Sequence, residues 1–388
     1  MHDETKIVTA GRHPRAHFGA VNPPVYHTST ILFDSFDAFQ NAAHEPENSR
    51  FAYGRLGTPT TTALEEAVAT LEGGSHCRLA PSGLAAITTA LTAFLAAGDH
   101  LLAPRSAYGP TRNFCATILK RFGVETTLYE PCIGAEIATL IRPNTRIVYT
   151  ESPTSGLFEV QDIPAIAAAA HARGATVIMD NTWASPLYFK PFAHGVDVSI
   201  QAATKYIVGH SDAMLGTITC TEESWPRLRD AHRQLGQTAG PDDAYLGQRG
   251  LRTIAVRMAQ HHQNGLALAR YLAARPEVAQ VMHPALEGDP GYALWRRDYL
   301  GASGLFSFIM RAQHSEAAIA AMLDGLALFG MGYSWGGYES LIAPVKIRRF
   351  RPDWPEDTWA MRIHAGLEHP DDLIADLDAG FARLRAAG

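Results

Sequence analysis

Short apolar runs alternate with alanine-rich segments of helical periodicity through the first two thirds of the chain. The runs are rich in β-branched residues and are separated by polar or glycine-containing stretches, which is typical of strands joined by helices. This alternation predicts an α/β fold with a mostly parallel sheet. The predicted strands lie within residues 101–104, 145–153, 175–183 and 197–205.

The pattern differs at the two ends of the chain. The N-terminal residues are polar and irregular, and they predict an arm. Near the C-terminus, strand-like runs at 303–310 and 360–366 and a final helical pattern predict a smaller α+β domain. We therefore expect an arm that contacts a neighbouring subunit (1–57), a large α/β domain (58–251) and a smaller domain (252–388).

The large domain is predicted to open with a helix in TPTTTALEEAVATLEGG, residues 58–74. Thr62 precedes Glu65 by three residues, which is the spacing of a capping box, and Gly73 is a typical stop signal.

Composition restricts the functions that this fold can serve. With 388 residues, 46% of them hydrophobic and 19% charged, the chain is large enough for two domains. The net charge of -6, without any cluster of lysine and arginine, argues against nucleic acid or a membrane surface as a partner. The chain has no signal-peptide pattern and no long apolar run, so we expect a cytoplasmic protein. The cysteines are scattered without a CxxC pair, which disfavours a metal site and a disulfide framework: Cys77, Cys115, Cys132 and Cys220.

Polar residues follow three of the predicted strands. Glu151 follows the second, Asp180 the third and Lys205 the fourth. The carboxyl ends of strands in an open α/β sheet meet at one edge, where ligands bind. We therefore expect Asp180 and Lys205 to face one crevice.

A phosphate site is predicted upstream, where the turn PSG opens an apolar helix at Gly83. Free N–H groups at a helix N-terminus bind phosphate, although strand–turn–helix junctions are also common as plain structure. The P-loop and GxGxxG patterns of nucleotide sites are absent. A phosphate cradle, a carboxylate and a lysine together suggest pyridoxal 5′-phosphate (PLP), which needs a lysine for covalent attachment and an anion beside its ring nitrogen.

Two longer motifs make this suggestion specific. The stretch DVSIQAATKYIVGHSD around Lys205 resembles the lysine signature of the PLP-dependent cysteine/methionine metabolism (trans-sulfuration) family. YSWGGYESL, which begins at Tyr333, resembles the cystathionine β-lyase branch of that family, and SRFAYGRLGTPT resembles its arm. The resemblance covers nearly the whole chain. It implies a fold-type I, aspartate aminotransferase-like structure.

The resemblance also implies roles for individual residues. Lys205 would carry PLP and move protons, Asp180 would pair with the ring nitrogen, and Tyr108 would stack on the ring and assist catalysis. The phosphate would be bound by Gly83 and Leu84 through their N–H groups, by the Thr204 hydroxyl, and by Tyr53 and Arg55 of a neighbouring subunit. Such sharing implies a homo-oligomer, a dimer of active dimers.

Substrate residues follow from the same resemblance. Arg362 would bind the α-carboxylate, helped by Ser334, with Tyr53 and Trp335 nearby. Asn113 occupies a position where β-lyases carry an aspartate near the distal amino group of cystathionine, so cystine or another β-thio amino acid is also a candidate substrate. Ala202 stands where many members of the family carry a serine that binds phosphate.

The implied activity is β-elimination of L-cystathionine, or of a related β-thio amino acid, to a thiol, pyruvate and ammonia in methionine biosynthesis. A γ-acting lyase or synthase and a PLP-binding regulator stay open, and Trp335 argues against the γ-acting enzymes. Structural roles also stay open: Asp180 could cap a helix, Arg362 could form a buried ion pair, and Tyr108 could pack in the core. The pair His261 and His262 lacks metal-ligand spacing and is predicted to lie on a solvated helix face.

Overall fold

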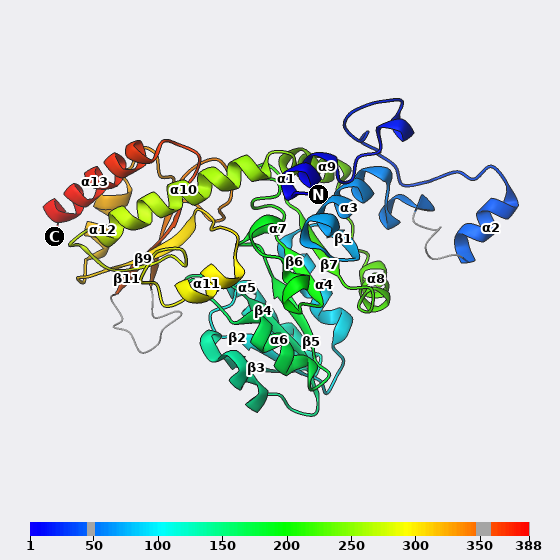
Figure 1. Ribbon diagram of the computed structural model, residues 1–388, viewed down its shortest axis with the longest axis horizontal. Helices are drawn as coiled ribbons and strands as arrows, with labels where there is room; N and C mark the ends of the chain where they lie inside the picture. Colours follow the sequence, from blue (N-terminus) through cyan, green and yellow to red (C-terminus); the bar gives the residue numbers. More distant parts are fainter. Residues whose placement is uncertain (45–50, 347–357, 388) are drawn as a thin grey trace.

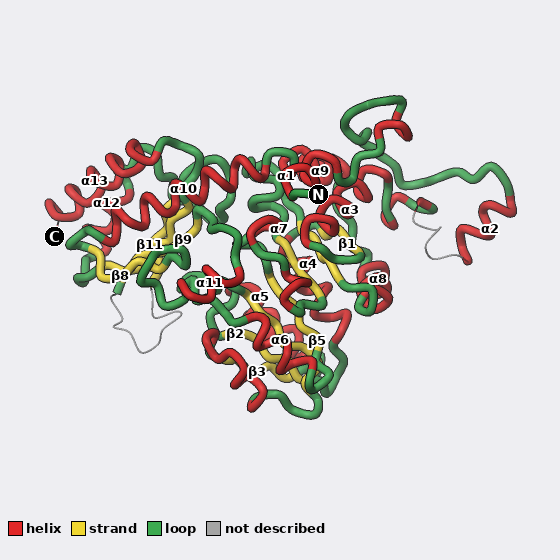
Figure 2. The backbone as a smooth tube through the Cα atoms, in the orientation of Figure 1, coloured by secondary structure: helices red, strands yellow, loops and turns green. Residues whose placement is uncertain are grey.

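The computed structural model describes residues 1–44, 51–346 and 358–387. Its two sheets lie side by side, with helices packed around each (Figures 1 and 2). Residues 45–50 of the predicted arm lie outside the described residues. No helix in the described ranges is long and apolar enough to cross a membrane.

The larger sheet has seven strands, and all neighbours pair in parallel except those of β7. The predicted mostly parallel sheet is therefore confirmed, and each of the four predicted strand runs overlaps one of its strands. Their order across the sheet is β1 (His76–Ala80), β7 (Gly216–Cys220), β6 (Val198–Gln201), β5 (Thr176–Asp180), β4 (Thr145–Glu151), β2 (His100–Pro104) and β3 (Glu125–Tyr129).

Helices bury both faces of this sheet, as parallel sheets require. Along β4, Ile147 packs in the cluster that includes helix α4 (Gly83–Phe94), whereas Val148 packs in the cluster that includes α6 (Ile163–His171). This alternation explains why the strands read as continuous apolar runs. The other helices of this part are α3 (Pro59–Glu72), α5 (Gly109–Phe114), α7 (Ser185–Tyr188), α8 (Trp225–Gln234) and α9 (Pro241–Leu251).

The predicted capping box of α3 is wrong in position. The helix begins at Pro59, three residues before Thr62, because the Thr58 side chain accepts the Thr61 N–H as the N-cap. Glu65 is buried instead, and it pairs with Arg78 at 2.9 Å. The predicted stop is correct, since Gly73 ends the helix with a φ of 83°.

The smaller sheet is antiparallel, with β10 (Leu341–Lys346), β11 (Trp359–His364), β9 (Leu305–Met310) and β8 (Val278–Met282) in that order. The long helix α10 (Ile254–Ala273) runs from the larger sheet to this one (Figure 1). Its N-terminus lies just beyond the predicted domain boundary at residue 251. Three more helices accompany this sheet: α11 (Tyr292–Asp298), α12 (Glu316–Leu323) and α13 (Pro370–Ala387).

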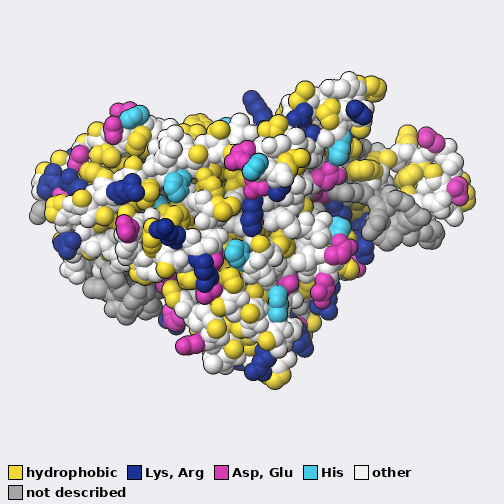
Figure 3. Space-filling model, viewed as in Figure 1, with side chains coloured by type: hydrophobic (Ala, Val, Ile, Leu, Met, Phe, Trp, Pro, Cys, Tyr) yellow, Lys and Arg dark blue, Asp and Glu magenta, His cyan; other side chains and the backbone are white. Residues whose placement is uncertain are grey.

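The N-terminal segment is less irregular than predicted. Helix α1 (Asp3–Thr9) packs against α3 and buries Ile7. The segment that carries α2 (Phe36–His44) extends away from the body of the molecule (Figure 1). On the face drawn in Figure 3 this extension displays many apolar side chains, whereas basic and acidic side chains are interspersed over the rest of that face.

Candidate active site

Lys205 lies in a turn just after β6, at the carboxyl edge of the larger sheet. Its Nζ atom donates a hydrogen bond to the Ser334 hydroxyl at 2.5 Å and lies 5.1 Å from the ring centroid of Trp335. Burial lowers the pKa of Lys205 to about 8, and the nearby charge of Arg362 adds to this effect. An appreciable fraction of the amine is therefore neutral near pH 7, and a neutral amine can act as a base.

Asp180 ends β5 and is buried. Burial raises the pKa of this carboxyl group. Its Oδ1 atom accepts the Thr182 hydroxyl at 2.5 Å and the Thr182 N–H at 3.0 Å. The Thr182 hydroxyl also accepts the Ala202 N–H at 2.8 Å, so this residue joins the end of β5 to the turn that carries Lys205.

Glu151 is the neighbour of Asp180 in the pairing of β4 with β5. Its carboxylate accepts the N–H of Tyr108 and the N–H of Ser155, each at 2.7 Å. Burial and the charge of Asp180 raise the pKa of Glu151 to about 8. Glu151 thus fixes the backbone at Tyr108, whose side chain is 43% exposed.

The predicted phosphate cradle is the N-terminus of α4. The Ser82 hydroxyl accepts the Ala85 N–H, and the first-turn N–H groups of Gly83 and Leu84 have no intrahelical acceptor. Gly83 packs so closely on Ala202 that an added Cβ would lie 2.5 Å from the Ala202 Cβ atom. The cradle is therefore held directly against the segment that leads to Lys205.

Arg362, on β11, brings the smaller sheet to this edge. Its Nη2 atom donates to the carbonyl oxygens of Gly332 at 3.4 Å and Ser334 at 3.2 Å. No carboxylate in the described residues pairs with it, so the alternative of a buried ion pair gains no support. The structure therefore brings Lys205, Ser334, Trp335 and Arg362 together.

Other predicted residues lack such contacts. The Arg55 guanidinium donates to the Arg233 carbonyl and lies over the Tyr53 ring, and neither contact reaches Lys205 within the part of the chain that the structure describes. Asn113 is an exposed residue of α5. The Thr204 hydroxyl is engaged with the backbone of Leu215. The roles predicted for these residues stay predictions.

The prediction for the histidine pair is wrong. His261 is fully buried and donates from Nδ1 to the Ala365 carbonyl at 2.8 Å, while His262 is half-buried and accepts the Ala302 N–H. Their helix, α10, packs against β8 and β9, so the face predicted to be solvated is covered.

Sequence reasoning missed three residues of this region. Glu151 was noted at its strand end without a role, and Thr182 and His364 were not considered. Only Thr182 had a local signal, since an aspartate two residues before a threonine is typical of a turn closed by the carboxylate.

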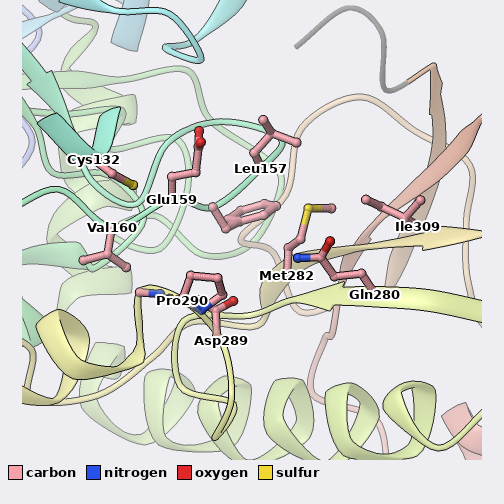
Figure 4. A pocket seen from close by; sticks show the side chains of 11 residues that line it. Cys132, Leu157, Glu159, Val160, Gln280, Met282, Asp289, Pro290 and Ile309 are labelled. Carbon is pink, nitrogen blue, oxygen red and sulfur yellow. Dashed lines mark hydrogen bonds between the residues drawn. The ribbon is translucent and has the colours of Figure 1, made fainter. Parts of the chain in front are cut away.

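A separate pocket of about 160 Å³ lies between the larger sheet's loops and strands β8 and β9 (Figure 4). Cys132 and Glu159 line one side and Gln280 and Met282 the other. None of the predicted site residues lines it, so it is distinct from the candidate active site.

The residues at the sheet edge fit PLP. The positive charge of a protonated ring nitrogen would compensate the buried Asp180 carboxylate, whose pKa is raised by burial, and the free N–H groups of α4 would bind the phosphate. Lys205, with its lowered pKa, would supply the amine for covalent attachment.

A family model described as "Cys/Met metabolism PLP-dependent enzyme" matches residues 4–382. The chain belongs to this family. The "Putative cystathionine beta-lyase" of Rhizobium johnstonii is 49% identical over 386 residues, which are 98% of this chain and 96% of that relative. The "Cystathionine beta-lyase MetC" of Escherichia coli is 47% identical over 388 residues, 98% of each chain.

Solved structures agree with this assignment. The crystal structure of cystathionine gamma-lyase from Lactobacillus plantarum complexed with L-serine superposes with a TM-score of 0.91 at 30% identity, covering 99% of this chain and 100% of that one. The predicted family, the fold-type I architecture, the PLP cofactor and the class of PLP-dependent lyase are thereby confirmed.

Proposed function

We propose that this enzyme catalyses β-elimination of L-cystathionine or a related β-thio amino acid, releasing a thiol, pyruvate and ammonia. The observation that carries the proposal is the meeting of Lys205, Ser334 and Trp335 at the edge of the larger sheet. The names of the relatives support the same reaction.

Arg362 is the proposed carboxylate-binding residue. Its guanidinium is half-buried, its described hydrogen bonds go only to carbonyl oxygens, and burial lowers its pKa. A substrate α-carboxylate would give Arg362 the negatively charged partner that the described residues do not provide. The two parallel N–H donors of a guanidinium group bind a carboxylate well. This contact would place the substrate Cα near Lys205.

Lys205 is the proposed proton carrier. Bound PLP supplies an electron sink for the pair left when the Cα proton is removed. The neutral Lys205 amine removes that proton, and the resulting ammonium group donates it to the departing sulfur atom. The Ser334 hydroxyl, 2.5 Å from Nζ, orients the amine for both transfers. Water then converts the remaining three-carbon unit to pyruvate and ammonia.

Trp335 favours β-elimination over γ-elimination. A γ-acting enzyme must also move a proton at Cβ, so its lysine must reach a second carbon atom. The half-buried indole ring, 5.1 Å from Nζ, restricts that movement. The choice between cystathionine and cystine depends on the distal end of the substrate, where Asn113 is the predicted contact.

Exposed apolar side chains in the N-terminal arm support assembly with other copies of the chain. Leu32 is 88% exposed and Phe36 is 76% exposed. Both follow Thr30, which pairs with Tyr53 in a β-bridge. Large apolar side chains at such density commonly mark interaction surfaces. We propose that the arm packs on a second subunit and that Arg55 reaches the phosphate there. The tetrameric assembly and the cytoplasmic location stay predictions.

The deciding experiment incubates the purified holoenzyme with cystathionine and identifies the products. Pyruvate with homocysteine is expected. Release of 2-oxobutyrate with cysteine would assign γ-elimination instead. Absence of turnover with both cystathionine and cystine would favour a regulatory role.

A further inference from the structure

Residues 332–337 form a loop, here called the substrate loop, that is held by one face of β11. Arg362 donates to the carbonyl oxygen of Ser334 at 3.2 Å, and His364 donates from Nε2 to that of Gly337 at 3.0 Å. Side chains two positions apart on a strand project from the same face. Arg362 therefore holds the first part of the substrate loop, and His364 holds its end.

The His364 ring is suited to a permanent contact. It is 1% exposed, and burial lowers its pKa to about 4, so the imidazole is neutral in the physiological range. The Gly337 carbonyl can only accept a hydrogen bond, which places the ring proton on Nε2. Nδ1 is buried without a partner among the described residues. The hydrogen bond to the substrate loop is thus the ring's polar contact.

The position of the substrate loop is critical for the site. Gly336 has a φ of 89° and approaches Lys205 so closely that an added Cβ would lie 3.0 Å from the Lys205 Cα atom. The Trp335 ring centroid lies 5.1 Å from the Lys205 Nζ atom and 5.5 Å from the Tyr206 ring centroid. A small displacement of the loop therefore changes how Trp335 faces Lys205.

The hydrogen bonds that Arg362 and Lys205 make to the loop are the ones that change during the reaction. If the proposed function is correct, on which this inference rests, Arg362 turns to the substrate carboxylate and Lys205 to the coenzyme. The His364 contact is needed for neither task. We propose that His364 is a positioning residue, which holds Gly337 so that Ser334 and Trp335 stay beside Lys205 while the other anchors change partners.

The first test compares two amides on the holoenzyme. In His364→Gln the side-chain N–H can take the place of Nε2, whereas in His364→Asn it cannot reach Gly337. A matched control is His283→Asn, since His283 is equally buried and also has one ring-nitrogen hydrogen bond, to the Ala285 N–H, away from the loop. Hydrogen–deuterium exchange of the peptide 365–368 is the readout, because the Leu367 N–H donates to the carbonyl oxygen of Tyr338, the residue next to Gly337.

We expect exchange in this peptide to rise about tenfold in His364→Asn, because one buried hydrogen bond is lost, and to stay near the wild-type rate in His364→Gln and His283→Asn. Equal exchange in the two His364 variants would refute the inference. This comparison needs no turnover, so it decides the inference even if the wild-type enzyme released no pyruvate, a result that would count against the proposed function alone.

A second test combines His364→Asn with Trp335→Ala and measures kcat/KM on a β-thio amino acid that the wild type cleaves. If His364 acts through the loop, His364→Asn lowers kcat/KM about tenfold in the wild-type background and less than about twofold beside Trp335→Ala. Equal losses in both backgrounds would mean that His364 contributes only to general stability, as His283→Asn is expected to do in both.

Discussion

Replacement of Thr182 by valine should weaken PLP binding in a pH-dependent manner. Valine has nearly the same shape, but it lacks the hydroxyl that donates to Asp180 at 2.5 Å and accepts the Ala202 N–H at 2.8 Å. A hydrogen bond to a charged group contributes about 1.5–3 kcal/mol. Its loss disfavours ionised Asp180 about 10- to 100-fold relative to the protonated form, since about 1.4 kcal/mol corresponds to a factor of ten.

The sign follows from the charge that PLP requires. In the predicted pairing only ionised Asp180 binds a protonated ring nitrogen, so the affinity for PLP should fall as the pH drops through the pKa of Asp180. Burial already raises that pKa, and the hydrogen bonds of Thr182 oppose the rise. In Thr182→Val the loss of affinity should therefore begin at a higher pH than in the wild type.

The assay titrates coenzyme-free protein with PLP by absorbance between pH 5 and 9. Thr182→Ser is the matched control, because it keeps the hydroxyl and loses only a methyl group. A curve for Thr182→Val that coincides with the wild type, or a shift of equal size in Thr182→Ser, would show that the hydroxyl does not support Asp180.

Four further outcomes are expected. Lys205→Ala should fold but lose turnover by more than the roughly 10²–10⁴-fold of an acid–base group alone, and near-normal pyruvate release would exclude Lys205 from catalysis. Asn113→Asp should raise kcat/KM for cystathionine relative to cystine, because a carboxylate attracts the distal amine; an unchanged ratio would exclude a role in selectivity. A mixture of Lys205→Ala and Arg55→Ala subunits, dissociated and reassembled, should regain activity if Arg55 serves a neighbour's site. Verified mixed oligomers that recover no activity would contradict an active site shared between subunits. Burial raises the pKa of Glu151 from 4.5 to about 8, so its contribution to the stability of the apoenzyme is complete below pH 4.5 and is lost as the pH rises through 8. Over that range the melting temperature of Glu151→Gln should therefore fall less than that of the wild type. Parallel melting curves against pH for the two proteins would refute this assignment.

Much of the larger sheet could be predicted because its strands are buried on both faces. Continuous apolar runs such as 145–151 are then distinct from the alanine-rich helices between them. The position of Lys205 and Asp180 at one edge followed from parallel strands alone. These features depend on local pattern and on one general rule of sheet topology.

Features that depend on distant packing were not predictable in the same way. Glu65 matched a helix-capping pattern, but its partner is Arg78, on the following strand. His261 looked exposed because nothing in its own helix shows that the second sheet covers it. The contact of His364 with Gly337 joins a strand to a loop 27 positions earlier, and no pattern around either residue indicates it.

The candidate site draws its parts from two different sheets, and this has an evolutionary consequence. Lys205 and Asp180, the residues proposed for the chemistry, belong to the larger sheet, whereas Ser334, Trp335 and Arg362, the residues proposed to face the substrate, come with the smaller one. Mutations in one sheet can thus alter which molecule is accepted without disturbing how bonds are broken. Such modularity allows gene duplicates to diverge in selectivity while the reactive centre is inherited intact.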